Sequence, residues 1–260
     1  MADEGTIHLE VDGYVLVMTI DRVAKRNSLT PQMMADLSLA FDRLTTDPGL
    51  RCGVLGAAGD HFTAGLDLLA FLPLMQGSVP TPEAGEIDAL QLKQRCPKPL
   101  IAALKGITLT VGIELALACD FAIAGTNTKF AQLETKRGIM VSGGGTVRWV
   151  QRAGLGNAMY HLLRGDQFDA AEALRIGLVQ EVVEDGEVDA RARALAHEIA
   201  ANAPLAVEAT KASVLAYLAD GEQSALSSLA ATQSRLTASA DAVEGATAMM
   251  QKREPVFRRA

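Results

Sequence analysis

The feature that most constrains the fold is a series of short apolar segments separated by stretches with helical spacing. None of these segments extends beyond a few residues before a Gly, a Pro or a charged residue interrupts it. Short strands that alternate with helices are typical of an α/β chain with parallel strand pairing. The strands are expected at residues 7–11, 14–20, 52–56, 100–104, 121–124 and 129–131.

Local signals define the first elements more closely. Asp12-Gly13 lies between two apolar runs and predicts a β-hairpin. Thr30-Pro31 has the form of an N-cap followed by Pro in the first helical turn, and Asp47-Pro48-Gly49 ends the helix that follows. Further helices are predicted at 87–95 and about 112–119, and residues 73–86, rich in Pro, Gly, Ser and Thr, indicate a mobile loop.

The pattern changes from about residue 187 onward. Ala- and Leu-rich segments with helical character follow one another with breaks near Pro204 and Gly221, and they are expected at 187–201, 204–219, 222–237 and 239–252. We therefore place a boundary near residue 200. The predicted organisation is a core of residues 1–200 and a C-terminal helical region of residues 201–260.

Composition excludes several classes of function. The chain of 260 residues has a formal net charge of -7 and few aromatic residues, and no Lys/Arg run indicates a nucleic-acid or anionic-membrane partner. No stretch of about 18 apolar residues predicts a membrane span, and the N-terminus does not resemble a secretory signal. Three well-separated cysteines are interpreted as reduced thiols of a cytoplasmic protein. The four histidines lack metal-ligand spacing.

Glu114 is the first candidate for chemistry. It lies in the segment Val111-Gly-Ile-Glu-Leu-Ala-Leu-Ala-Cys-Asp120, where its neighbours are apolar on every helical face. Thr110 and Ala118, four residues before and after it, offer no cation. Because an ionised carboxylate is costly to bury without a partner, this position indicates a functional acid, a Glu on the one wet face of the helix, or a pair with a distant Arg.

Three other segments carry weaker signals. Glu134 precedes Thr135-Lys136-Arg137 and is open to interpretation as a solvated loop residue. Ser142-Gly-Gly-Gly-Thr146 favours either a loop that lines a pocket at a helix start or a tight packing turn. Phe62-Thr-Ala-Gly-Leu-Asp67 places a Gly before a helical segment, which can expose free N–H groups.

Taken in order, these segments resemble the enoyl-CoA hydratase/isomerase (crotonase) family. The resemblance runs from Lys25-Arg-Asn-Ser-Leu-Thr-Pro31 to Lys252-Arg-Glu-Pro-Val-Phe257. Lys98–Gly106 resembles the strand before an oxyanion loop, and Gly112–Asp120 resembles the active-site helix. Glu134 follows Glu114 by 20 residues, which is the spacing of the two carboxylates in the hydratase branch.

The resemblance implies a spiral of ββα turns, a C-terminal helical region used in trimer assembly, and an acyl-CoA thioester as substrate. It implies a homotrimer, or a hexamer of two trimers, and no metal or redox cofactor. The backbone N–H groups of Leu66 and Val111 would form the oxyanion hole, and Glu114 and Glu134 would be the catalytic carboxylates. The positions that would contact CoA or substrate are Lys25, Arg26, Ala64, Asp67, Leu68, Gly112, Lys252 and Phe257.

The expected reaction is addition of water across the 2,3 double bond of an enoyl-CoA thioester. The alternatives are double-bond isomerisation, which needs only one carboxylate, another reaction of the same fold (thioesterase, decarboxylase or dehalogenase), and acyl-CoA binding without catalysis. Leu66 and Val111 stand where the family usually has small residues. Their bulk is therefore expected to narrow the acyl pocket near the thioester.

Overall fold

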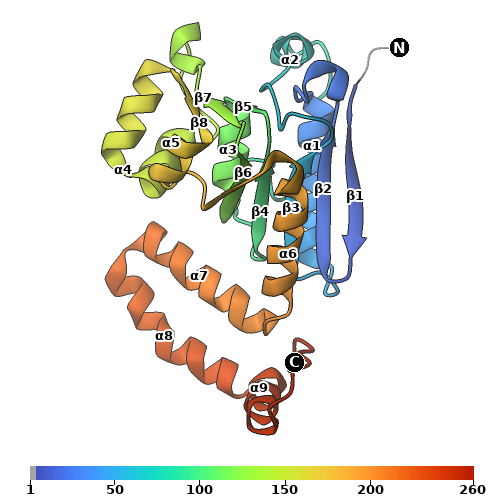
Figure 1. The fold of residues 1–260 in the computed structure, drawn as a ribbon, viewed down its shortest axis with the longest axis vertical. Helices are drawn as coiled ribbons and strands as arrows, with labels where there is room; N and C mark the ends of the chain where they lie inside the picture. Colours follow the sequence, from blue (N-terminus) through green and yellow to red (C-terminus); the bar gives the residue numbers. More distant parts are fainter. Residues whose placement is uncertain (1–3) are drawn as a thin grey trace.

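The computed structural model describes residues 4–260 and shows two sheets with helices packed around them (Figure 1). The larger sheet has six strands in the order β1-β2-β3-β4-β6-β9, and the smaller has the order β5-β7-β8. The strands of the larger sheet are β1 (Thr6–Asp12), β2 (Val15–Asp21), β3 (Cys52–Ala57), β4 (Leu100–Leu104), β6 (Phe121–Gly125) and β9 (Glu181–Val183). The smaller sheet contains β5 (Ile107–Leu109), β7 (Lys129–Ala131) and β8 (Gln167–Asp169).

The hairpin and the parallel pairing predicted from the sequence are confirmed. β1 and β2 pair antiparallel across the turn at Gly13, which has a positive φ of 59°. From β2 onward, each neighbouring pair of the larger sheet is parallel. The expected helix after Thr30 is α1 (Pro31–Thr46), and the Thr30 side chain accepts a hydrogen bond from the N–H of Met33 at 3.2 Å.

Alternation along the strands divides the core between the two faces of the larger sheet. In β2, Leu16, Met18 and Ile20 pack in a cluster with residues of α1 and of α3 (Val111–Ala118). Val15 and Val17 face the other way, toward buried residues of α6 (Val188–Ala200). The helix α3 is buried along its whole length. A charged residue on α3 therefore cannot reach bulk water.

The prediction of a helix at residues 87–95 is wrong, because the structure has turns and irregular backbone there. Side chains, and not a helical series of carbonyl groups, make hydrogen bonds to the backbone of this segment. The carboxylate of Asp88 accepts hydrogen bonds from the N–H groups of Leu90, Leu92 and Lys93. Arg148 donates to the carbonyl oxygens of Leu90 and Gln91. Asp competes in this way with a helical hydrogen-bond ladder, so helical spacing alone did not decide the local structure.

The second half of the chain adds α4 (Gly145–Arg164), α5 (Ala170–Arg175) and the C-terminal helices α7 (Pro204–Asp220), α8 (Glu222–Thr237) and α9 (Ala240–Gln251). The short α2 (Leu68–Met75) follows β3, and three single turns are η1 (Val23–Lys25), η2 (Glu134–Arg137) and η3 (Asp185–Glu187). The helices expected after residue 187 are confirmed as α6 to α9. Across residues 4–260, no helix combines the length and apolar character needed to cross a membrane.

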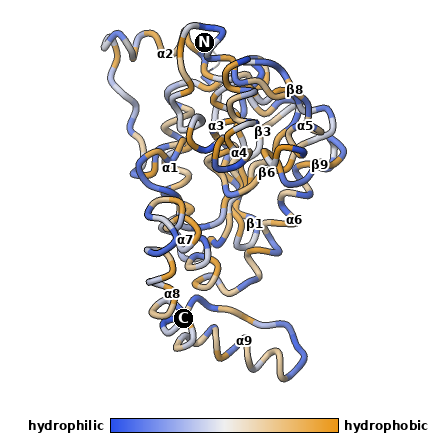
Figure 2. Tube along the Cα trace, turned by 90° about the vertical axis from the view of Figure 1, so that its left-hand side faces the viewer, coloured by the Kyte–Doolittle hydropathy of each residue, from blue (hydrophilic) through white to orange (hydrophobic). Residues whose placement is uncertain are grey.

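The helices α7 to α9 extend away from the sheets, and Figure 1 shows the C-terminus at the opposite end of the molecule from α2. Figure 2 shows hydrophobic residues recurring along α8 and α9 at a distance from the core. Several of their large apolar side chains are exposed, among them Leu226, Leu229, Val243, Met249 and Met250.

Candidate active site

The site is built where the segment after β3 crosses the turn between β5 and α3. Thr63 pairs in parallel with Thr108, and the N–H of Leu109 donates to the carbonyl of Thr63 at 3.1 Å. Gly65 has φ of 107°, and a Cβ on it would lie 2.4 Å from Oγ1 of Thr110. Only glycine fits this position, because its backbone lies against the residue that precedes α3.

This crossing brings the two predicted oxyanion donors, Leu66 and Val111, into one region. Leu66 pairs with Leu29 through its neighbours: Leu29 donates to the carbonyl of Gly65 at 2.9 Å and accepts from Asp67 at 2.8 Å. In a parallel bridge of this form, the N–H of Leu66 itself points away from Leu29. Val111 is the first residue of α3, so its N–H has no acceptor within the helix. Within residues 4–260, neither N–H donates to another protein group.

The turn before Val111 is strained. Thr110 has φ of 50° and ψ of -114°, a region that disfavours β-branched residues, and its N–H donates to the carbonyl of Ala131 at 2.9 Å. A conformation of this type costs on the order of 1–3 kcal/mol and persists where the surroundings enforce it. The strain falls at the residue that sets the direction of the Val111 N–H.

Glu114 projects from the first turn of α3 toward the glycine-rich segment that opens α4. Its side chain is buried, and its Oε1 accepts a hydrogen bond from the N–H of Gly145 at 3.1 Å. A Cβ on Gly143 would lie 2.6 Å from Oε2 of Glu114. The glycines therefore line the pocket of this carboxylate, and the alternative of a wet helix face does not apply. The positive charge of Arg148 lowers the pKa of Glu114, but the two form no ion pair among residues 4–260.

Burial raises the pKa of Glu114 above its usual value, and the negative charge of Glu134 raises this pKa further. The backbone N–H groups of Gly145 and Gly143 oppose the rise, because they stabilise the ionised form. The interaction between the two carboxylates shows that they share one electrostatic environment. The raised pKa makes this carboxylate a stronger proton acceptor than an exposed glutamate.

Glu134 begins η2, three residues after Ala131 at the end of the strand β7. Its side chain is 8 % exposed, so it is buried and not the solvated residue that its cationic neighbours in the sequence allowed. Oε1 accepts a hydrogen bond from Nε2 of Gln132 at 3.2 Å. Oε2 is buried and has no protein partner among residues 4–260.

Two residues that sequence reasoning missed support Glu134. Gln132 is 1 % exposed, and its Oε1 accepts a hydrogen bond from Nε1 of Trp149 at 3.2 Å. Trp149 lies on α4, is fully buried, and is the only tryptophan of the chain. A single Trp in a chain with few aromatic residues was the available signal, since a buried indole N–H needs an acceptor.

The N-terminal residues expected on the CoA path surround the loop after β3. Lys25 and Arg26 are exposed, and the carbonyl of Arg26 accepts from the N–H of Ala64 at 2.9 Å. Leu68 begins α2 and is 53 % exposed. Asp67 forms an ion pair with Arg22 at 2.8 Å and caps α2 by accepting from Ala70.

The remaining predicted CoA- or substrate-binding residues, Gly112, Lys252 and Phe257, do not lie in the loop after β3. A Cβ on Gly112 would lie 2.5 Å from Cγ2 of Thr63, so this glycine allows α3 to pack against the loop. The carbonyl of Phe257 accepts from Arg51, which precedes β3, at 2.7 Å. Phe257 and Lys252, which caps α9, therefore lie at the end of the sheet away from the site. They do not reach the site of their own chain.

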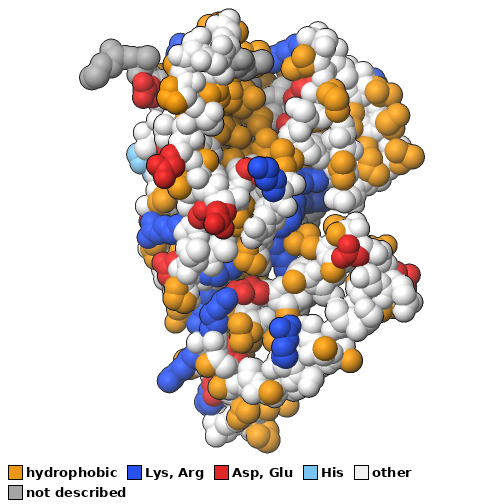
Figure 3. Space-filling view, turned by 180° about the vertical axis from the view of Figure 1, so that it is seen from behind, with side chains coloured by type: hydrophobic (Ala, Val, Ile, Leu, Met, Phe, Trp, Pro, Cys, Tyr) orange, Lys and Arg blue, Asp and Glu red, His pale blue; other side chains and the backbone are white. Residues whose placement is uncertain are grey.

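The space-filling view from behind shows the molecule hollowed in its upper half, between the side that carries α1 and α2 and the side that carries α4 (Figure 3). Hydrophobic side chains gather in this hollow. An apolar hollow with a few convergent polar groups is the usual form of a small-molecule site.

Comparison with known proteins gives a consistent picture. Residues 10–260 match the profile of the enoyl-CoA hydratase/isomerase family. A probable enoyl-CoA hydratase/isomerase from Mycobacterium abscessus is 44 % identical in sequence, with a TM-score of 0.93 over 97 % of this chain and 98 % of its own. An enoyl-CoA hydratase of Mycobacterium tuberculosis is 37 % identical over 96 % of this chain and 95 % of its own length. The (E)-benzylidenesuccinyl-CoA hydratase of Thauera aromatica is 39 % identical over 79 % of this chain and 80 % of its own length. The structural match confirms the predicted crotonase-like α/β fold with C-terminal helices.

The raised pKa of Glu114 predicts how the variant Glu114→Gln changes stability. Because the folded chain binds this proton more tightly than the unfolded chain, stability is lost as pH rises from the usual value of 4.5 toward the raised value. Above the raised pKa the buried charge destabilises the fold, whereas Gln cannot ionise, so Glu114→Gln should gain stability over the native chain as pH rises above 4.5, by about 2 °C or more in Tm. The gain should disappear below pH 4.5.

Thermal unfolding at several pH values measures this effect. The matched control is Glu83→Gln, which removes an exposed carboxylate and should leave Tm unchanged at every pH. An equal or lower Tm for Glu114→Gln at neutral pH would contradict the burial argument.

Proposed function

This chain belongs to the enoyl-CoA hydratase/isomerase family, and we propose that it adds water across the 2,3 double bond of an enoyl-CoA thioester. The observation that carries the proposal is the pair of buried carboxylates Glu114 and Glu134, which interact electrostatically. Hydration needs a base for water and an acid for the α-carbon, whereas isomerisation needs a single proton shuttle. Both glutamates being buried in one environment favours hydration.

In the proposed reaction, Glu114 takes a proton from water, and the water oxygen forms a bond to the β-carbon. The double-bond electrons move toward the thioester carbonyl, and Glu134 delivers a proton to the α-carbon. The net change is addition of one water molecule. The backbone N–H of Gly145 holds Oε1 of Glu114, which restricts the direction in which this carboxylate orients water.

Charge that develops on the thioester oxygen needs donors that are already in place. The N–H groups of Leu66 and Val111 are suited to this role, because no protein group among residues 4–260 accepts from them. An oxyanion donor of this type is worth about 3 kcal/mol in the transition state. The strained turn at Thr110 holds one of the two donors in place.

The first test replaces each carboxylate by the nearly isosteric amide. Glu114→Gln and Glu134→Gln should each reduce hydration of crotonyl-CoA by about 10²-fold or more, because neither amide exchanges a proton at neutral pH. The double variant should be about as slow as the slower single variant, because groups that act on one water molecule are not additive. Loss of the enoyl-thioester absorbance measures the rate.

Binding of CoA thioesters provides the control, since neither carboxylate is proposed to hold the nucleotide and affinity should change little. If only Glu134→Gln is inactive and the native chain moves a double bond without adding water, the isomerase alternative is favoured. Full turnover by both variants would refute the carboxylate mechanism.

A second prediction concerns the acyl group. Leu66 is partly exposed beside the proposed oxyanion hole, whereas Val111 is buried in the core, so Leu66 is the residue that can contact an acyl chain. Leu66→Ala should increase kcat/KM for branched relative to linear enoyl-CoA thioesters, because it widens the pocket near the thioester. Leu69→Ala, at an 82 % exposed position nearby, is the control. An unchanged ratio for Leu66→Ala would contradict the steric role.

We also propose that the chain assembles as a homotrimer, or as a hexamer of two trimers, through the C-terminal region of residues 201–260 and the outer face of α4. Val147, Leu155, Met159 and Leu163 of α4 are exposed, as are the apolar residues of α8 and α9. Apolar surface of this extent is typical of protein–protein contacts. Lys252 and Phe257 would then approach CoA in a neighbouring subunit.

Light scattering should therefore give three or six times the chain mass of 27.4 kDa. A stable monomer at micromolar concentration would contradict the assembly and also the proposed role of Lys252 and Phe257.

The three cysteines are buried and unpaired, and burial raises the pKa of Cys52 and Cys119 to about 12. These inert thiols support a proposed cytoplasmic location.

A further inference from the structure

We infer that Trp149 and Gln132 are positioning residues, which hold Oε1 of Glu134 so that Oε2 carries and transfers the catalytic proton. The inference rests on the proposed role of Glu134 as the acid and names the oxygen that performs it. The observation behind it is a buried chain of hydrogen bonds that runs from α4 to the carboxylate and leaves one oxygen unpartnered.

The chain of hydrogen bonds has only one possible direction. The indole Nε1 of Trp149 is a donor and never an acceptor, so the atom of Gln132 that lies 3.2 Å from it must be the carbonyl oxygen. The amide nitrogen of Gln132 then faces Glu134, and it lies 3.2 Å from Oε1. A reversed amide would leave two donors facing each other at Trp149.

This direction decides the roles of the two carboxyl oxygens. Oε1 accepts from Gln132 whether Glu134 is ionised or protonated, because the oxygen of a carboxylic acid that lacks the proton is still an acceptor. The proton therefore belongs on Oε2, which is buried and has no protein partner among residues 4–260. An unpartnered oxygen of this kind is costly in a resting fold and indicates a place where a ligand atom binds.

The backbone around Glu134 is fixed independently of this chain of bonds. The carbonyl of Glu134 accepts from the N–H of Ile139 at 3.2 Å, and Oγ1 of Thr135 donates to the carbonyl of Leu162 on α4 at 3.3 Å. What remains free is rotation of the carboxyl group about its own side-chain bonds. Gln132 removes that freedom.

Trp149 is itself held in an aromatic cluster beneath η2. Its ring lies 5.9 Å from Phe168 and 5.8 Å from His161 between centroids, and Phe168 stacks on Phe130 at 5.4 Å. Phe130 lies on β7, two residues before Gln132. The donor and the acceptor of the Trp149–Gln132 bond are therefore fixed by the same packing.

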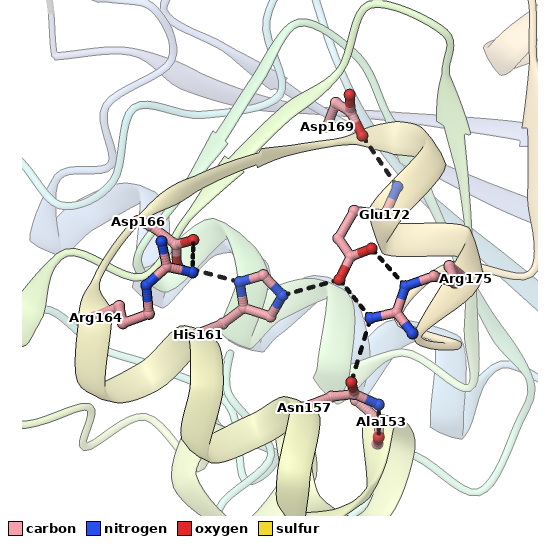
Figure 4. A network of polar contacts seen from close by, with 8 residues as sticks. All are labelled: Ala153, Asn157, His161, Arg164, Asp166, Asp169, Glu172 and Arg175. Atoms are coloured by element: carbon pink, nitrogen blue, oxygen red, sulfur yellow. Dashed lines mark hydrogen bonds and ion pairs between the residues drawn. The ribbon is translucent and has the colours of Figure 1, made fainter.

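Polar contacts fix the far side of this cluster (Figure 4). His161 lies between Asp166 at 3.2 Å and Glu172 at 3.4 Å, and Arg175 donates to both Glu172 and Asn157. These contacts join the end of α4 to α5. They prevent the ring of His161 from moving away from Trp149.

The first experiment uses the indole resonance of the only tryptophan as a probe that is independent of turnover. In a ¹⁵N–¹H correlation spectrum, Gln132→Leu should move the Trp149 indole proton upfield and reduce its protection from exchange, because the acceptor is lost. Glu134→Gln should leave it in place, since the amide at position 134 still accepts from Gln132. An unchanged indole resonance in Gln132→Leu would overturn the inference.

The second experiment measures crotonyl-CoA hydration by Trp149→Phe and Gln132→Leu. Each should reduce kcat by about tenfold, which corresponds to the loss of one ordinary hydrogen bond, with KM little changed. The double variant should be no slower than the slower single variant, because both residues act through one bond. In a Glu134→Gln background, Trp149→Phe should have no further effect.

Phe168→Leu is the matched control. It loosens the same aromatic cluster but retains the indole N–H and its acceptor, so it should lower Tm while reducing kcat by less than Trp149→Phe does. If Trp149→Phe keeps native kcat while Glu134→Gln is inactive, the positioning role is refuted and the hydratase mechanism stands. If Glu134→Gln is fully active, the hydratase mechanism fails instead, and the indole resonance alone decides whether the chain of hydrogen bonds exists.

Discussion

The site depends on the burial of a carboxylate on a helix that offers it no polar neighbour. All eight residues of α3 are buried, so Glu114 has to find its partners outside its own helix. The glycines that open α4 provide them, because residues without a Cβ allow backbone N–H groups to approach the carboxyl oxygens. The interaction couples α3 to α4, and α4 in turn carries Trp149 into contact with Gln132. One energetic requirement thus helps to place the two carboxylates proposed to be catalytic.

A second close approach sets the proposed oxyanion hole. Gly65 lies against Thr110, and this contact brings the loop after β3 beside the start of α3. The cost appears as backbone strain at Thr110, a residue with positive φ that is β-branched. A rigid turn of this kind is useful for the proposed catalysis, because preorganised donors need no rearrangement when charge develops on the thioester.

Much of the fold could be predicted from local patterns. Asp12-Gly13, Thr30-Pro31 and the C-terminal helices depend on turn chemistry, capping and periodicity, which are properties of neighbouring residues. The helix predicted at residues 87–95 does not form, because Asp88 and Arg148 make hydrogen bonds with the backbone of this segment. Arg148 lies 58 and 57 residues after Leu90 and Gln91, whose carbonyl oxygens accept its hydrogen bonds. Long-range hydrogen bonds of this kind leave no periodic signal.

The same distinction explains which parts of the site the sequence revealed. Glu114 could be recognised by its apolar neighbours alone, but Glu134 has a local sequence typical of a solvated loop and is identified by its spacing within the family resemblance. Glu134 is linked to Trp149, which lies on a separate helix, only through Gln132, so the role of Gln132 becomes clear only when both of its hydrogen bonds are known. The acid and the base of the proposed reaction therefore differ in how the fold controls them. The backbone N–H of Gly145 holds Oε1 of Glu114, whereas side chains hold Glu134, so a substitution at Gln132 or Trp149 can alter the proposed acid and leave the hydrogen bond of the proposed base in place.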